Sequence, residues 1–350
     1  MTQTTRYAQV LAKIGAERSK LLSEAKIKTL TETKKLSELS AQLRDTSYQE
    51  QITKLPLPLT SRTLERAFHE NLIATTVKII KNSPRQSAKY LSLYLYRFEA
   101  ENIKTLIKTT NAKLNREQKL AKLYLSAEDY LKNRAVIEEA AKAETIKQIV
   151  NVLKRTEYAL ALGMGQQSYE EDGSTTCLDV LIDKVFHEKL YSSYVSLSKN
   201  EKAKAYFYAS MENDGFTLLT LLRGKNLNYD PNWLRLAVPP DNFNIYADTV
   251  EEMVTAVDFE SALKIALDSY YGGFFVRTQN PEDTLANAEK AFKKAILEHA
   301  KASRVSENFN LGSPLSYLTQ KEVEVHNLTA ISSGVEAAVK PEDIQTQLSL

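Results

Sequence analysis

The stretch EVHNLTAISSGVE at residues 324–336 follows a pattern that occurs three times in the chain. The other copies are FEAENIKTLIKTTN at residues 98–111 and ENDGFTLLTLLRGKN at residues 212–226. In each copy an acidic residue is followed one helical turn later by Asn or Thr, and aliphatic residues then recur at helical spacing. The pattern therefore predicts three related helices. The acids are Glu99, Asp214 and Glu324, the polar residues are Asn102, Thr217 and Asn327, and the first aliphatic residues are Ile103, Leu218 and Leu328.

An aromatic motif precedes each copy in the same order. FHENL at 68–72 precedes the first copy, FHEKL at 186–190 the second and AFKKAI at 291–296 the third. Further upstream, LRDTSY at 43–48 resembles LKRTEY at 153–158. The third counterpart, LDSYY, is a poor match. Several motifs that recur in one order indicate an internal repeat.

The length of the repeat sets the expected domain organisation. A repeat of about 110–120 residues is a small domain rather than one turn of a solenoid, whose repeats span a few tens of residues. Three such repeats fill the 350 residues. We therefore expect helical repeat domains at residues 1–127, 128–240 and 241–350.

The composition favours helices throughout. Glycine (10) and proline (9) are scarce for a chain of 350 residues, and few turn-forming residues indicate short connections. Helical periodicity is visible in most stretches, and no convincing series of strands is seen, so the predicted fold class is all-α. The expected breaks between helices are KLPLPLT (54–60), NSPR (82–85), GMGQQSYEEDGSTT (163–176), VPPDNFN (238–244), YYGG (270–273), RTQNPED (277–283) and NLGSP (310–314).

Charge and cysteine usage exclude several classes of protein. The 46 basic and 44 acidic residues give a net charge of +2, which is not the basic field of a dedicated nucleic-acid binder. The single cysteine, Cys177, excludes a disulfide within the chain and suits a reducing cytoplasm. No apolar run is long enough to span a bilayer, and the N-terminus lacks the apolar core of a signal peptide. We expect a cytoplasmic protein that reaches a membrane only through a partner.

No catalytic, cofactor-binding or metal-binding residue is predicted. Gly224 and Lys225 lack the rest of a phosphate-binding loop, and GMGQQS is half of a dinucleotide-binding motif. Cys177 is expected in a polar loop without a helper motif for nucleophilic chemistry. The histidines form no zinc-binding pair, and no cysteine cluster could complete such a site. They are His69, His187, His299 and His326, of which His69 and His187 hold matching repeat positions that favour a packing role.

The repeated acids and polar residues are expected to be structural. They lie beside an aliphatic stripe such as Ile103, Leu106 and Ile107, which has the spacing of a buried helix face. Polar groups next to such a stripe are hydrogen-bonded inside the domain, because unpaired buried polar groups are costly. A catalytic site in three copies is disfavoured.

Several motifs of the chain resemble those of a known protein family. YAQVLAKIGAERSKLLSE at 7–24 is similar to the opening of the C subunit of archaeal and bacterial A/V-type rotary ATPases, with Tyr7, Arg18, Ser19, Leu21 and Leu22 in matching places. LRDTSY, the thrice-repeated acid segment with LLRGK, and the C-terminal EVEVHNL with KPEDIQTQL resemble later segments of that family in the same order. The resemblance spans the whole chain. The eukaryotic relative of that C subunit is the d subunit of the vacuolar ATPase.

The resemblance implies a fold and a role. It implies an all-α funnel of three similar domains in pseudo-threefold arrangement, without cofactor, small-molecule substrate or nucleic acid. It implies a non-catalytic rotor adaptor between central-stalk subunits of the D and F type and the membrane proteolipid ring, which serves proton or sodium transport. The protein would be peripheral, held on the cytoplasmic face of the cell membrane by its partner subunits.

Three other functions stay open from sequence alone. A cytoplasmic helical scaffold unrelated to rotary ATPases fits the composition equally well. An RNA-binding helical protein could use lysine-rich faces such as residues 108–122, although a solvated helix face is the better interpretation of that stretch. An enzyme is the least favoured, because the expected motifs are missing.

Overall fold

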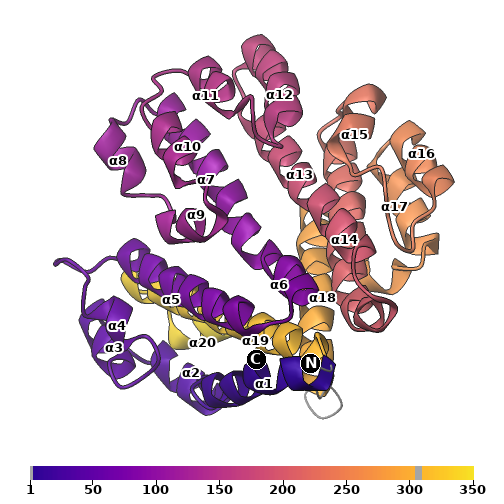
Figure 1. Cartoon of the computed structure of the whole chain (residues 1–350). Coiled ribbons are helices and arrows are strands. Elements are labelled where there is room, and N and C mark those ends of the chain that lie inside the picture. Colours follow the sequence, from indigo (N-terminus) through magenta and orange to yellow (C-terminus); the bar gives the residue numbers. More distant parts are fainter. Residues whose placement is uncertain (1–2, 304–309) are drawn as a thin grey trace. The chain divides into compact units, whose positions relative to one another are not determined.

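The computed structural model describes residues 3–303 and 310–350, and within these ranges every regular element is a helix (Figure 1). The all-α prediction is confirmed. The chain forms two compact units, one made of Met1–Ser92 with Leu297–Leu350, and one made of Leu93–Ile296. The domain boundaries predicted at 127/128 and 240/241 stay a prediction, as does the pseudo-threefold funnel.

The first unit combines the two ends of the chain. Its long helices α5 and α19 pack along each other, and α1 packs against both. Short helices complete the unit. The helices are α1 (Gln3–Arg18), α2 (Glu24–Thr31), α3 (Leu36–Leu43), α4 (Gln49–Ile52), α5 (Ser61–Asn82), α6 (Arg85–Leu91), α19 (Gly312–Glu336) and α20 (Pro341–Thr346). Helix α18 (Pro281–Ala302) crosses the boundary between the units.

The second unit contains two hydrophobic clusters. One gathers apolar residues from Ala100 to Ile182 and the other gathers those from Met211 to Phe292. Helices α7 and α14 each supply a long apolar face to one cluster. The elements are α7 (Leu93–Asn111), α8 (Arg116–Leu120), α9 (Leu125–Leu131), α10 (Arg134–Ala140), α11 (Ile146–Leu153), α12 (Ala159–Asp172), α13 (Thr176–Val195), α14 (Lys199–Asn226), α15 (Pro231–Ala237), α16 (Ala247–Thr255), α17 (Phe259–Asp268) and the 3-10 helix η1 (Gly272–Phe274).

The three repeated segments form helices as predicted, at the ends of α7, α14 and α19. The stripe of Ile103, Leu106 and Ile107 is buried. Gly224 and Gly334 hold the same position in α14 and α19. A Cβ atom at Gly224 would collide with the side chain of Leu234 in α15, and one at Gly334 with Ile344 in α20. Glycine at these positions lets the following short helix pack directly onto the long one.

The short helices α15 and α20 each begin with a proline. Pro231 and Pro341 each stand in the first turn, where proline lacks only an N–H that would have no helical partner. The Asp230 carboxylate accepts hydrogen bonds from the backbone N–H groups of Asn232, at 2.7 Å, and Trp233, at 3.2 Å. These bonds satisfy two donors at the start of α15.

One predicted break is wrong. Most of residues 163–176 belong to helix α12, which continues from Ala159 to Asp172. The glycines of this stretch suggested a loop, but a Cβ at Gly165 would collide with Leu178 of α13. Gly165 therefore allows α12 and α13 to pack closely. Only Gly173, with a left-handed backbone conformation (φ 72°), ends the helix in the usual manner of glycine.

Candidate functional site

Three buried carboxyl groups lie at equivalent positions on the helices that contain the repeated segments, α7, α14 and α19. Glu99 on α7 is 3% exposed, Asp214 on α14 is 0% exposed and Glu324 on α19 is 4% exposed. A buried carboxylate needs partners, because burial of an unpaired charge is costly. We call each acid with its partners a junction, named after the acid.

The Glu324 junction joins the two ends of the chain within the first unit. Tyr48 donates its hydroxyl hydrogen to Glu324 Oε1 at 2.7 Å, and the backbone N–H of Leu22 donates to Oε2. Lys321 forms a buried ion pair with Glu324, with Nζ 2.8 Å from Oε1. The Lys321 ammonium also lies over the Tyr48 ring, 3.9 Å from its centroid, a favourable cation–π geometry.

The Glu99 junction has the same plan within the second unit. Tyr158 donates its hydroxyl hydrogen to Glu99 Oε2 at 3.1 Å, and the Asn133 amide donates to Oε1. Burial raises the pKa of Glu99, although both donors and the nearby Lys189 oppose that rise. The side chain is therefore held by hydrogen bonds rather than by a contacting cation.

The Asp214 junction uses more backbone donors than the other two. The N–H of Phe243 donates to Asp214 Oδ1 at 2.9 Å and that of Asn244 to Oδ2 at 2.7 Å. Tyr271 donates its hydroxyl hydrogen to Oδ2 at 2.9 Å. Burial raises the pKa of Asp214, and these hydrogen bonds act in the opposite direction.

The three junctions share one geometry. Each acid accepts one hydrogen bond from a residue just before a short helix, which is α10 for Glu99, α16 for Asp214 and α2 for Glu324. It accepts another from a tyrosine just after the following short helix, which is α11, α17 or α3 in the same order. Each acid thus fixes both ends of a two-helix segment to a long helix. Tyr271 lies in LDSYY, the poor third match, yet it has the same role as Tyr48 and Tyr158.

The polar residue one turn after each acid forms hydrogen bonds with another segment of the chain. Asn102 accepts from the Tyr124 N–H at 2.8 Å and donates to its carbonyl at 3.3 Å. Asn327 exchanges the same pair of bonds with Ser349, at 2.9 and 2.8 Å. Thr217 donates instead to the Asn242 side chain at 2.7 Å. The expectation that these polar residues are hydrogen-bonded inside the fold is confirmed.

Besides Lys321, the lysines Lys119 and Lys225 are buried, which the sequence did not indicate. Lys119 lies in the stretch 108–122 that was predicted to be a solvated face, yet it is 2% exposed and donates to the Ala143 carbonyl at 2.5 Å. Lys225 donates to the carbonyls of Val254 at 2.6 Å and Ala256 at 2.7 Å. Each lysine donates to carbonyls in the last turn of a short helix, α10 or α16, or just after it, where a cation is favourable.

A further carboxyl group, Glu128 on α9, lies fully buried next to the Glu99 junction. Asn102 donates to Glu128 Oε1 at 2.7 Å, and Oε2 has no hydrogen-bond partner among the described residues. Burial raises the pKa of Glu128 to about 8, and the nearby Glu99 and Asp129 add to the shift. Glu128 is therefore mostly protonated at neutral pH in the folded chain.

The protonation of Glu128 makes stability depend on pH. Its pKa rises from an ordinary 4.5 in the unfolded chain to about 8 in the fold, so the unfolded chain binds fewer protons between these values. Stability should fall as the pH rises through this window. We expect Glu128→Gln to leave the free energy of unfolding unchanged below pH 4.5 and to raise it by about 4–5 kcal/mol at about pH 9. Denaturant titrations of both proteins across the window would measure this, and a constant difference would contradict it.

The matching histidines differ in their surroundings. His187 on α13 is 7% exposed, stacks on Phe216 with ring centroids 4.1 Å apart, and meets Phe186 edge-on. Burial lowers the pKa of His187 to about 3, with Arg97 and Lys104 contributing, so the ring is neutral and packs as an aromatic group. His69 lies partly buried on α5.

Cys177 is not in a polar loop as predicted. It lies in the first turn of α13 and is 1% exposed. Its thiol sulfur accepts a hydrogen bond from the Ser168 hydroxyl at 3.0 Å. Within residues 3–303 and 310–350, no three His, Cys, Asp or Glu side chains are grouped as metal ligands. That the chain holds no catalytic, cofactor or metal residue stays a prediction.

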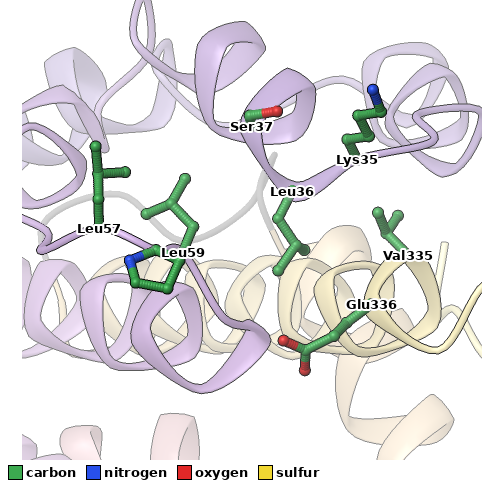
Figure 2. Close-up of a pocket in the computed structure, with 8 residues that line it drawn as sticks. Lys35, Leu36, Ser37, Leu57, Leu59, Val335 and Glu336 are labelled. Carbon is green, nitrogen blue, oxygen red and sulfur yellow. The ribbon is translucent and has the colours of Figure 1, made fainter.

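An apolar surface groove of about 770 Å³ lies in the first unit (Figure 2). It is formed by the start of α3, the proline-containing loop before α5, and the end of α19. Figure 2 shows Leu36 pointing from α3 toward α19. The lining residues are Lys35, Leu36, Ser37, Leu57, Pro58, Leu59, Val335 and Glu336.

Comparisons with known proteins confirm the family resemblance. The model of the family described as ATP synthase (C/AC39) subunit matches residues 10–347. The chain is 26% identical over 346 residues to the A-type ATP synthase C subunit of Methanocaldococcus jannaschii, covering 98% of this chain and 86% of that protein. The corresponding protein of Haloferax volcanii is also 26% identical, covering 97% of this chain and 96% of that protein. That of Thermococcus kodakarensis is 24% identical, covering 97% and 90%.

Proposed function

Because the chain belongs to the ATP synthase (C/AC39) subunit family, we propose that it is a non-catalytic rotor adaptor of an A/V-type ATPase or ATP synthase. The adaptor would couple the central stalk to the membrane proteolipid ring for proton or sodium transport. The observation that carries this proposal is the family match over residues 10–347, nearly the whole chain.

The use of polar groups in the junctions supports a mechanical role. Glu99, Asp214 and Glu324 are buried and bonded to donors within their own unit. Groups held in this way fix the short helices onto the long ones. A protein that transmits torque needs rigid, well-packed elements of this kind, because densely packed interiors transmit strain.

The proposed partners are central-stalk subunits of the D and F type on one side and the proteolipid ring on the other. Among the described helices, none combines the length and apolar character needed to cross a membrane. We propose that partner subunits hold the protein on the cytoplasmic face of the cell membrane. Three helical domains, at residues 1–127, 128–240 and 241–350, would surround the stalk as a pseudo-threefold funnel.

The test is an affinity pull-down of the tagged full-length protein from detergent-solubilised native membranes, read by mass spectrometry. We expect stalk subunits of the D and F type together with the proteolipid. Salt washing without detergent should release the protein from membranes, because it would be held through partners. Recovery of neither partner, with the protein in the soluble fraction, would refute the adaptor and favour a helical scaffold unrelated to rotary ATPases.

A further inference from the structure

The groove in the first unit lies beside a position at which the three two-helix segments differ. The residue that begins the second helix of each two-helix segment is Leu36 in α3, Ile146 in α11 and Phe259 in α17. Ile146 is 4% exposed and Phe259 is 7% exposed, and both belong to hydrophobic clusters. Leu36 is only half-buried and lines the groove instead.

The segment that follows each junction tyrosine explains this difference. After Tyr158 the chain forms α12, which packs along α13 and against α11. Leu162 of α12 joins the cluster that contains Ile146, and Tyr169 packs against that cluster. In the second unit, a helix of the chain itself therefore packs against α11 and contributes to the cluster that contains Ile146.

The end of α12 also reaches the end of the long helix. Tyr169 donates its hydroxyl hydrogen to the side chain of Asn111, the last residue of α7, at 2.9 Å. The equivalent last residue of α19 is Glu336, which lines the groove and bonds to Ser61 at the start of α5. Both positions lie the same number of residues after their acid.

After Tyr48 the chain does not form such a helix. A single turn, α4, leads into an extended loop with Pro56 and Pro58, since proline disfavours helix at the preceding residue. Leu57 at the tip of this loop is 84% exposed. The segment after Tyr271 differs from both, because Phe274 stacks on Phe292 with ring centroids 4.7 Å apart.

We propose that the groove of the first unit binds an amphipathic α-helix of a partner protein. The internal repeat indicates the kind of occupant, because an equivalent place beside α11 and α13 is covered by a helix of this chain. The helix would present an apolar face to Leu36, Leu57 and Val335. Because Lys35 stands at the rim, an acidic side chain or the carboxyl end of the helix is the favoured neighbour there. This proposal rests on the repeat geometry and not on the proposed rotor role.

The test uses the full-length protein in native membranes, with photoreactive benzoyl-phenylalanine in place of Leu57. The matched control carries it in place of Leu160, which is 76% exposed on α12. We expect Leu57 to crosslink to one polypeptide, at a segment with helical spacing of apolar residues, and the Leu160 control not to reach that segment. Leu36→Glu should lower the yield about tenfold or more, because it places a charge in the apolar contact.

A second variant keeps the test sharp if Leu36→Glu unfolds the unit. Lys35 is exposed, and its side chain forms no capping bond at α3, so Lys35→Glu should fold normally. We expect Lys35→Glu to reduce the crosslink as well, because the charge reversal repels an acidic neighbour. Crosslinks only to lipid, to the same chain or to a second copy would overturn the proposal, as would a yield that neither variant changes.

The outcomes separate this proposal from the rotor role. A helical crosslink from Leu57, combined with a pull-down that recovers neither stalk nor ring subunits, would support the groove and contradict the proposed function. Recovery of stalk and ring subunits in the pull-down, without a helical crosslink from Leu57, would support the proposed function and overturn the groove.

Discussion

Glu324→Ala is expected to be the most destabilising single substitution in the first unit. It removes the acceptor for the Tyr48 hydroxyl and the Leu22 N–H, and it leaves the Lys321 ammonium, which is 2% exposed, without its carboxylate. Loss of one partner from a buried ion pair costs about 3–5 kcal/mol. Chemical denaturation of the full-length protein would measure the free energy of unfolding. The transition should be followed with a spectroscopic probe placed in the first unit.

Two comparisons make that result specific. Glu50→Ala removes a carboxylate from an exposed pair with Lys54, in which both side chains are mostly solvent-accessible, and should change the free energy of unfolding little, because water screens the pair. The double substitution Lys321→Met with Glu324→Leu should be less destabilising than Glu324→Ala, because it leaves no unpaired buried charge. Equal losses for Glu324→Ala and Glu50→Ala would contradict a structural role of the Glu324 junction.

The three long helices could be predicted because their evidence is local. An acid, a polar residue and an aliphatic stripe at helical spacing specify one helix with a buried face, and Ile103, Leu106 and Ile107 are buried as expected. The partners of the acids could not be predicted in the same way. Repetition shows which residues are equivalent but not which tyrosine meets which acid, and Glu324 bonds to Tyr48 from the other end of the chain.

The wrong predictions share a physical cause, since tertiary packing overrode local composition. Gly163 and Gly165 resembled a loop, but Gly165 permits close helix packing. Cys177 follows that stretch and was therefore predicted to be outside a helix, whereas it is buried in α13. Lys119 resembled a solvated lysine, and only the fold places its ammonium against the Ala143 carbonyl. Backbone acceptors of this kind have no signature in the sequence.

The groove is a second feature that the sequence predicts only in part. Pro56 and Pro58 correctly predicted an extended break before α5. The consequence, an uncovered Leu36, becomes visible only when the three junctions are compared in space. The differences between the copies are therefore as informative as the shared positions, because they reveal where the first unit leaves an apolar side chain exposed.

Asp214→Ala is expected to be the most damaging change at the junctions of the second unit. The carboxylate is 0% exposed and accepts from the N–H groups of Phe243 and Asn244 and from the Tyr271 hydroxyl. The substitution leaves all three donors without this acceptor in a poorly hydrated site, at about 1–3 kcal/mol for each donor that water cannot reach. We expect the free energy of unfolding to fall by about 3 kcal/mol. Relative to the unsubstituted protein, amide hydrogen exchange should accelerate more in α16 and α17 than in α10 and α11.

A series of milder variants tests whether the loss arises from these hydrogen bonds. Asp214→Asn keeps one acceptor oxygen but adds an amide donor, so it should cost less than Asp214→Ala. Tyr271→Phe removes one donor to Asp214, while the ring remains packed against Phe292, and should cost about 1 kcal/mol. Because Asp214 and Tyr271 act on one bond, the double variant Asp214→Ala with Tyr271→Phe should lose less than the sum of the single variants. Strict additivity would mean that the bond contributes little, and that the carboxylate acts mainly through the backbone ahead of α16.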